Sequence, residues 1–544
     1  MPRSHDRRAL IALVAIQLAV TLLIRPRGEF PINDDWAYAH SVLWLLDEHW
    51  VRLSDWIAMN LLPQTLAGGL VAAVFGFSFE ALRHLTQVVA LLVSVAAYSW
   101  FRANRLEAGT ALVATLAVIA FPAWPQLANS YMSDLYGLVF ALPAATLFLR
   151  ALDEPSRGRL IAATLLAAAG VLQRQVVLVV PFAFLVAWLW SRRPWSVRTL
   201  AIGIVPFVVS CVAELAYRAY LITGPGVPDA QQYLHGRVLP LLMRVISDAE
   251  GHRAYVGENL GTMIGYLGLF LVAWAAYWGM GGASRASRVS VIGGGVLLAG
   301  LALAFDVVPP FLALQLVDAA GIGPFTLYDG IPRGIDGLER GPGIVWRVAG
   351  VAAAFGVAAL AVLVAATISH LAREGRRADR ERVFLAAYLV GYLGPFIVTA
   401  YIDRYLLFTL PFLFALWSHT WKRETGPALR GAALAWIVAT IGMSMAGTRD
   451  YFAWNRERWD LIRTAEARGA TPETLDGGFE YNGFRRHEVR PRGVVAGKSW
   501  WWVKDDAYVI AFAAVPGYEE IDRRVVRHWL PRSPGEVRLL RRKA

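Results

Sequence analysis

Residues 343–368 read GIVWRVAGVAAAFGVAALAVLVAATI, and Arg347 is the only charged residue in this stretch. A run of about 20 apolar residues is long enough to cross the hydrocarbon core of a bilayer as one helix. Apolar types make up 56% of the 544 residues and charged types only 17%, whereas a soluble domain carries about a quarter charged residues. The sequence therefore predicts a polytopic, all-α membrane protein.

Apolar runs of this kind recur along the chain and predict about thirteen transmembrane helices. Only Gln173-Arg174-Gln175 separates the fifth run from the sixth. These two runs are either two spans or one long kinked helix, and the second alternative would invert the topology of everything after it. With two separate helices at this point, the predicted spans are residues 9–24, 82–101, 108–124, 135–152, 160–172, 176–190, 199–220, 258–279, 290–305, 343–368, 383–400, 405–420 and 431–447.

The positive charges of the chain follow one set of predicted loops. The formal net charge of +12 would suggest a nucleic-acid partner for a soluble protein. Here the segments on the side of the N-terminus hold 20 Lys and Arg residues, and the loops on the other side, without the C-terminal domain, hold 10, a roughly fourfold difference in density. The positive-inside rule thus places the N-terminus in the cytoplasm and the C-terminal domain outside the cytoplasmic (plasma) membrane. We expect membrane lipids, not nucleic acid, around this chain.

The first apolar run resembles a signal peptide because Arg3, Arg7 and Arg8 precede it. Residues 25–28 (RPRG) offer no small-residue cleavage site, so an uncleaved first span is predicted. The single cysteine, Cys211, lies in an apolar run. We expect a buried, inert thiol there, and the sequence excludes a disulfide within the chain.

Two domains are expected. Residues 1–447 form the transmembrane domain, and its first outer loop, residues 25–81, is far too long for a simple connection. Amphipathic stretches in that loop, at 35–50 and 60–77, fit helices that lie in the membrane interface. Residues 448–544 are predicted to form a small extracytoplasmic α+β domain, with a helix at about 450–468, strands within 493–503, 508–515 and 537–540, and a Trp500-Trp501-Trp502 run that we expect to pack in its core and not to touch a glycan.

An acidic pair follows the first predicted span, in residues 30–38 (FPINDDWAY). Carboxylates at a membrane are costly and are therefore functional candidates. Asp34 and Asp35 can supply a general base and a partner for a cation or hydrogen bond, and their oxygens would suit a divalent ion. The structural alternative is that Asn33 or Asp34 caps a helix beginning at Trp36.

Three further charged residues interrupt apolar sequence on the same predicted membrane face. Asp134, in residues 130–136 (SYMSDLY), is a site residue or the N-cap of the fourth span. Arg404, in residues 401–405 (YIDRY), suits a phosphate, which a guanidinium grips with two hydrogen bonds; it pairs alternatively with a nearby acid or snorkels to the interface. Arg174 is either a site residue or part of a simple polar turn.

A carboxylate beside an arginine suits sugar transfer from a phosphate carrier. The base removes a proton from the acceptor hydroxyl, and the cation offsets the charge that grows on the departing phosphate. Sequence spacing does not show that these residues converge. Neither a Walker-type phosphate loop nor an HExxH metal motif occurs in the sequence.

These motifs resemble those of the GT-C superfamily of membrane glycosyltransferases, in the branch of protein O-mannosyltransferases and lipid A aminoarabinose transferases. The resemblance comprises an acidic pair followed by Tyr after a first span, a Met-x-Asp in the second outer loop and a late acid-Arg-Tyr. In this chain they are Asp34-Asp35-Trp36-Ala37-Tyr38, Met132-Ser133-Asp134 and Asp403-Arg404-Tyr405.

The resemblance implies an inverting transfer from a polyprenyl-phosphate sugar, independent of metal or weakly assisted by one. It implies Asp34 as the base, while Asp35 departs from the glutamate common at the second position. Arg174 lies where related enzymes often carry a lysine. The implied roles are catalytic for Asp34, Asp35 and Asp134, donor-phosphate binding for Arg404, Arg174 and Tyr405, and substrate binding for Tyr38 and Tyr131.

The sequence therefore predicts a membrane glycosyltransferase that moves a sugar from a polyprenyl-phosphate donor to a glycolipid, a cell-envelope glycan or a protein. One alternative is a transporter or flippase of lipid-linked sugars, which would also need many spans and buried charges. Internal repeats would favour that alternative, and none is evident. A second alternative is a noncatalytic envelope assembly protein, which would not require Asp34 or Arg404.

Overall fold

The structure is a computed structural model. It describes residues 4–192, 194–235, 238–247, 251–309, 326–327, 343–375, 379–399, 401–487, 503, 505–531 and 533–543. The expected strand at 493–503 and the three tryptophans at 500–502 lie outside the described residues, apart from Val503.

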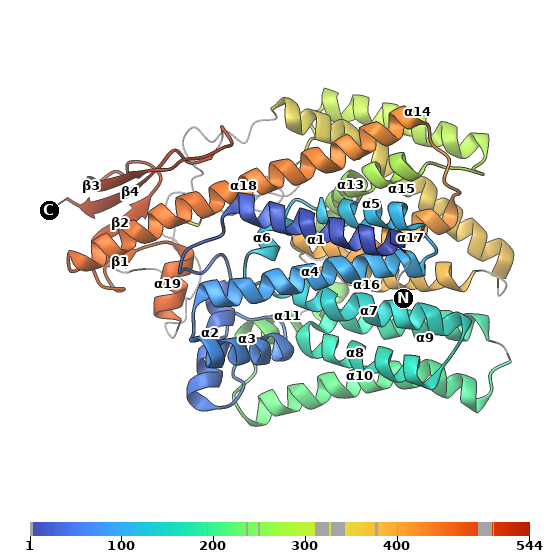
Figure 1. Ribbon diagram of the computed structural model, residues 1–544, viewed down its shortest axis with the longest axis horizontal. Coiled ribbons are helices and arrows are strands. Elements are labelled where there is room, and N and C mark those ends of the chain that lie inside the picture. Colours follow the sequence, from blue (N-terminus) through green and yellow to red (C-terminus); the bar gives the residue numbers. More distant parts are fainter. Residues whose placement is uncertain are drawn as a thin grey trace.

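A helical bundle makes up most of the described chain (Figure 1). Several of its helices begin at a serine N-cap: the side chains of Ser78, Ser156, Ser196 and Ser284 each accept a hydrogen bond from the backbone N–H three residues later. The helices are α1 (Ser4–Ile24), α2 (Asp35–Glu48), α3 (Leu62–Phe75), α4 (Phe79–Ala103), α5 (Ala108–Ile119), α6 (Trp124–Ala128), α7 (Ser133–Asp153), α8 (Arg157–Gln173), the 3-10 turn η1 (Gln175–Leu178), α9 (Val179–Ser191), α10 (Val197–Thr223), α11 (Asp229–His235), α12 (Val238–Ser247), α13 (His252–Trp278), α14 (Arg285–Ala304), α15 (Ile344–Glu374), α16 (Arg380–Val398), the 3-10 turn η4 (Asp403–Thr409), α17 (Leu410–Thr420), α18 (Pro427–Ala467) and α19 (Phe479–Arg486).

The predicted membrane class is confirmed. Nine helices in the described part of the chain are long and apolar enough to cross a membrane. Three shorter apolar helical segments accompany them, at Leu62–Phe75, Ala108–Ile119 and Gln175–Ser191. Each of the thirteen predicted spans overlaps a helix. Several of these helices are too short to cross a membrane alone, and turns interrupt some of the predicted spans, as η1 and η4 do.

The chain reverses direction at Arg174. The end of α9 lies beside the end of α7, because the Arg192 guanidinium donates a 2.9 Å hydrogen bond to the Leu152 carbonyl. Helix α8 begins at the same end, just after α7. Residues 160–172 and 176–190 therefore lie on two helices that run in opposite directions, and a single kinked helix is excluded.

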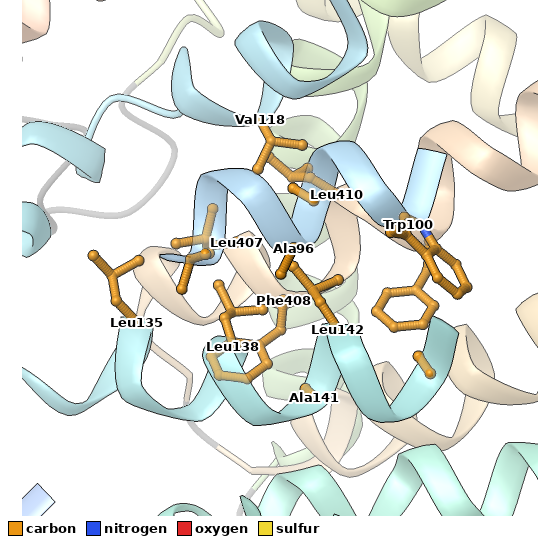
Figure 2. Close-up of a cluster of buried hydrophobic side chains, with 14 of the residues drawn as sticks. Ala96, Trp100, Val118, Leu135, Leu138, Ala141, Leu142, Leu407, Phe408 and Leu410 are labelled. Atoms are coloured by element: carbon orange, nitrogen blue, oxygen red, sulfur yellow. The ribbon is translucent and has the colours of Figure 1, made fainter. Parts of the chain in front are cut away.

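The centre of the bundle is packed by side chains from helices far apart in the sequence. Figure 2 shows Trp100 of α4, Val118 of α5, Leu138 of α7, Phe408 of η4 and Leu410 of α17 in one cluster of side chains, and all five are buried. Lipid tails are as apolar as these side chains, so close van der Waals packing stabilises such a bundle. This packing holds η4, which carries Arg404, against α7, which carries Asp134.

The C-terminal part is a four-stranded sheet carried by α18. Strand β1 (Leu475–Asp476) pairs in parallel with β2 (Tyr508–Ala511), and β4 (Glu536–Arg542) pairs antiparallel with both β2 and β3 (Tyr518–Val525). The expected boundary at 447 falls inside α18, which runs without a break for 41 residues from the bundle to the sheet (Figure 1). One helix therefore belongs to both parts.

Candidate active site

Two acids and two arginines converge at the end of the bundle near the C-terminal part. The Arg174 Nη1 lies 2.8 Å from the Asp134 Oδ1. The Arg404 Nη1 lies 3.8 Å from the Asp134 Oδ2, and its Nη2 lies 3.6 Å from the Asp34 Oδ2. These residues come from four separate segments of the chain, so the convergence that sequence spacing left open is present in the structure.

Asp34 is the most exposed member of this quartet. Its side chain is 18% exposed, whereas those of Arg404 and Arg174 are each 4% exposed and that of Asp134 is fully buried. Asp34 occupies the N-cap position of α2, but its side chain makes no capping hydrogen bond. Its Oδ1 instead accepts a 2.8 Å hydrogen bond from the Trp56 Nε1. The capping role does not account for this carboxylate.

Asp35 is turned away from the quartet. Its side chain is buried, and its Oδ2 accepts a 3.3 Å hydrogen bond from the Ile32 N–H of its own turn. Burial raises the pKa of Asp35 to about 7, against the lowering effect of the Tyr131 backbone amide. Burial also raises the pKa of Asp34, while Arg404 and the Trp56 N–H lower it. Of the two acids, Asp34 is the one placed to meet a substrate.

Asp134 and Arg174 form the buried base of the site. Asp134 lies in the first turn of α7 and is not its N-cap. Arg174 also donates to the Ser133 hydroxyl over 3.1 Å. Helix α7 makes room for the aliphatic part of the Arg174 side chain at Gly137, where an added Cβ would lie 2.9 Å from the Arg174 Cδ. The turn at Arg174 is therefore built into the charged centre of the bundle and is not a simple polar connection.

Arg404 lies between the two acids, Asp34 and Asp134, and within the described part of the chain it does not use all of its N–H donors. Both of its contacts with carboxylates are longer than a normal hydrogen bond. Its Nε has no hydrogen-bond partner among the residues that the structure describes. The ring of Tyr405 lies 5.7 Å from the Arg404 guanidinium and 5.3 Å from that of Arg174. A guanidinium held this way can bind an anionic group without first giving up a tight ion pair.

The two other predicted tyrosines have different surroundings. Tyr38 is buried one turn along α2 from Asp34, and burial together with the Asp34 charge raises its pKa. The Tyr131 hydroxyl donates a 2.7 Å hydrogen bond to the backbone carbonyl of Gln64. The substrate-binding role assigned to these tyrosines stays a prediction.

No cluster of three or more His, Cys, Asp or Glu side chains that could hold a metal ion occurs among the described residues. Among the described residues, the cation that lies within 4 Å of the Asp34 carboxylate is the Arg404 guanidinium. A divalent ion at Asp34 and Asp35 also stays a prediction.

Arg83 is a structural residue of the site that the sequence did not single out. It is buried on α4, and its guanidinium donates to the backbone carbonyls of Pro26, Gly28, Phe30 and Asn129 over 2.9–3.1 Å. It therefore fixes the segment that leads into the acidic pair. No local sequence pattern indicates such a role, because all four acceptors are backbone atoms.

Substitution Arg83→Met should destabilise the protein. Each buried carbonyl left without a partner costs about 1–3 kcal/mol, so we expect a large fall in the melting temperature measured in detergent, with loss of activity. Arg463→Met, which removes an exposed guanidinium on α18, is the control and should melt like the wild type. Equal melting of Arg83→Met and the control would contradict this role.

Trp56 is a second residue whose role the sequence did not reveal, since only the fold brings its indole N–H to Asp34. Trp56→Phe keeps an aromatic ring there but removes the donor. Because that hydrogen bond lowers the pKa of Asp34, its loss should raise this pKa and move the acidic limb of the pH–rate profile to higher pH. Trp50→Phe, which removes an exposed indole bonded to Glu48, should leave the limb in place. An unmoved limb in Trp56→Phe would argue against Asp34 as the titrating group.

One family model and several solved structures match this chain. A family model described as dolichyl-phosphate-mannose-protein mannosyltransferase matches residues 66–217. The match confirms the predicted resemblance to the GT-C membrane glycosyltransferases. The matched segment contains Asp134 and Arg174 but neither the Asp34–Asp35 pair nor Arg404. No curated protein matches the chain.

Three solved structures are also similar to this chain. ArnT from Cupriavidus metallidurans is 17% identical: its apo structure covers 88% of this chain and 84% of its own, with a TM-score of 0.37, and its complex with undecaprenyl phosphate covers 97% of each, with a TM-score of 0.38. The Archaeoglobus fulgidus oligosaccharyltransferase, in complex with Zn and sulfate, is 13% identical, covers 72% of this chain and 53% of its own, and has a TM-score of 0.30. Similarities this low do not identify a sugar or an acceptor.

Proposed function

We propose that this chain transfers a sugar from a polyprenyl-phosphate donor to a hydroxyl acceptor by an inverting displacement. The observation that carries the proposal is the partly exposed Asp34 carboxylate, 3.6 Å from the Arg404 guanidinium. A general base and a phosphate-binding cation are the two groups that this reaction needs side by side.

In the proposed reaction Asp34 accepts the proton of the acceptor hydroxyl. The acceptor oxygen bonds to the anomeric carbon as the bond from that carbon to the phosphate oxygen breaks. Arg404 binds the departing phosphate, and Arg174 adds positive charge behind it while it holds Asp134. A positioned base contributes about 10²–10⁴-fold to such a rate, and a cation aimed at the developing charge contributes comparably.

We further propose that the site faces the extracytoplasmic side of the cytoplasmic membrane. Arginines of two Arg-rich loops, Arg192 and Arg380, both donate to the Leu152 carbonyl at the end of α7. Asp134 lies at the opposite end of the same helix. The positive-inside rule puts the Arg-rich end in the cytoplasm, so the donor would bind between helices and a glycolipid, glycan or protein acceptor would enter from outside.

Purified protein and a panel of polyprenyl-phosphate sugars test the proposal. We expect release of polyprenyl phosphate together with a glycosylated acceptor, with the anomeric configuration inverted. A flippase would move the intact donor across a vesicle bilayer and leave its sugar–phosphate bond unbroken. Translocation without bond cleavage for every donor would overturn the proposed function.

A further inference from the structure

The C-terminal part shares a hydrophobic core with the segment that leads into the acidic pair. The Phe30 ring stacks on Trp459 of α18, with centroids 6.2 Å apart and planes at 10°. This segment is therefore packed by the C-terminal part and not only by the bundle. The buried residues of this core include Ile24, Phe30 and Ile32 before the acids, Tyr451, Trp454 and Leu461 on α18, and Ile510 and Leu539 in the sheet.

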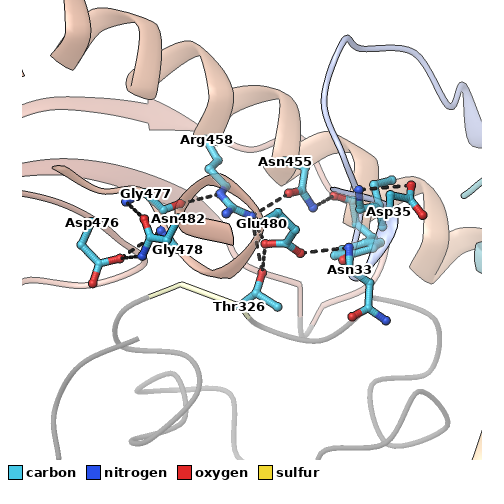
Figure 3. A network of polar contacts seen from close by, with 12 residues as sticks. Asn33, Asp35, Thr326, Asn455, Arg458, Asp476, Gly477, Gly478, Glu480 and Asn482 are labelled. Atoms are coloured by element: carbon cyan, nitrogen blue, oxygen red, sulfur yellow. Dashed lines mark hydrogen bonds and ion pairs between the residues drawn. The ribbon is translucent and has the colours of Figure 1, made fainter. Parts of the chain in front are cut away.

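A buried polar network continues from this core to the acids (Figure 3). The Glu480 side chain on α19 and the Arg458 side chain on α18 are both fully buried and lie 2.7 Å apart. The Glu480 Oε2 also accepts a 2.7 Å hydrogen bond from the Thr326 hydroxyl. Its other oxygen, Oε1, accepts a 3.1 Å hydrogen bond from the backbone N–H of Asn33.

Asn33, directly before the two acids, has an unusual backbone conformation. Its φ is +54°, in the left-handed region that residues other than glycine seldom adopt. Such a conformation persists only where its surroundings hold it. Asn33 immediately precedes Asp34, and Glu480 accepts a hydrogen bond from its N–H.

Helix α19 also packs against the aromatic residues around Asp34. Phe479 lies 6.0 Å from Trp36 and 5.8 Å from Trp56, centroid to centroid. At Gly483 the helix touches the Trp36 indole so closely that an added Cβ would lie 2.5 Å from its Cε2. Trp56 is the donor to Asp34, so α19 supports both the turn before Asp34 and the partner of its carboxylate.

We propose that Glu480 is a positioning residue for Asp34, and that through it and Gly483 helix α19 holds the acid in its catalytic orientation. The inference rests on the proposed function for its kinetic consequences. The C-terminal part would then be needed for turnover even if it does not bind the acceptor. The buried Arg458 fixes Glu480, because an uncompensated charge at that depth would be costly.

The first test is a substitution that moves α19 away from the segment carrying the acids and leaves every charged side chain in place. Gly483→Ala should push α19 off Trp36, whereas Gly535→Ala, in the same part of the chain, adds a Cβ that meets nothing within 4 Å. A displacement of about 1 Å at a catalytic group costs up to roughly 100-fold. We therefore expect kcat to fall about 10- to 100-fold in Gly483→Ala and to stay unchanged in the control, with donor KM similar in both.

Hydrogen exchange supplies a readout that does not depend on turnover. The amides of residues 30–40 should exchange faster in Gly483→Ala than in the wild type and the Gly535→Ala control, while α7 amides stay protected. Unchanged exchange and unchanged kcat in Gly483→Ala would overturn the inference. If the wild type transfers no sugar but Gly483→Ala still speeds exchange at residues 30–40, the positioning role of α19 is supported and the proposed function is contradicted. The failure of one proposal is therefore distinguishable from the failure of the other.

The second test uses charge. The groups that act on the Asp34 carboxylate are Arg404, Asp134, Glu480 and the Trp56 N–H, and Glu480 raises its pKa. Glu480→Gln retains an acceptor for Asn33 but loses the charge, so the acidic limb of the pH–rate profile should move to lower pH. Glu519→Gln, which removes an exposed acid on β3, should not move it. A role of Glu480 confined to folding of the sheet predicts an unmoved limb, and that result would overturn the proposal.

Discussion

Asp34→Asn should slow sugar transfer by about two to four orders of magnitude while donor binding is retained. The amide keeps the size of the carboxylate and can still accept the hydrogen bond from Trp56, but it cannot take a proton from the acceptor. A loss of about 10²–10⁴-fold in kcat is the range expected for a positioned general base. The measurement is the initial rate of polyprenyl phosphate release at saturating donor, with donor binding measured separately.

Asp47→Asn is the matched control for this substitution. Asp47 lies on the same helix, α2, and is exposed, so the control should retain the wild-type rate. Asp35→Asn distinguishes the two acids: because the Asp35 carboxyl is buried and directed into its own turn, we expect a smaller effect on kcat than for Asp34→Asn. Full activity of Asp34→Asn would show that another residue is the base.

Arg404→Ala should reduce kcat/KM for the donor by about 10²–10³-fold, the range found when one charge-stabilising group is removed from an active site. The same change has a pH signature. Arg404 lowers the pKa of Asp34, so its removal should raise that pKa and move the acidic limb of the profile to higher pH. Donor binding and the pH dependence of the initial rate are the measurements.

Arg404→Lys and Arg463→Ala are the comparisons for this prediction. Lysine keeps the charge but not the planar fork that binds a phosphate with two hydrogen bonds, so it should restore part of the lost rate. Arg463 is exposed on α18, and its replacement should change neither kcat/KM for the donor nor the pH of the acidic limb. Wild-type donor affinity in Arg404→Ala would mean that the phosphate binds elsewhere.

Much of the bundle could be predicted from the sequence, because its signals are local. Runs such as residues 343–368 specify helices by length and hydrophobicity alone. The break at Arg174 was visible as three polar residues, but its geometry was not: the reversal is evident only from a long-range contact, that of Arg192 with Leu152. The 447 boundary marked a change in composition, and a helix can continue through such a change, as α18 does.

The site was predictable only in part, because some of its residues carry a local signal in the sequence and others are recognised only by their contacts in the fold. A charged residue in apolar sequence stands out, so Asp34, Asp134, Arg174 and Arg404 were evident candidates. Trp56 did not stand out among the other tryptophans of its loop, and Glu480 lies in a polar domain where carboxylates are common. Each is distinguished only by a contact that the fold creates: Trp56 donates a hydrogen bond to Asp34, and Glu480 accepts one from the Asn33 N–H. Strand β3 was missed because YEEIDRRV is too charged to resemble a strand.

The most direct test of the central claim follows one donor through one turnover. Purified wild type and Asp34→Asn are each loaded with the same polyprenyl-phosphate sugar, and polyprenyl phosphate is measured with and without acceptor. We expect rapid, acceptor-dependent release by the wild type, and bound but uncleaved donor in Asp34→Asn. Release at equal rates by the two proteins would contradict the claim.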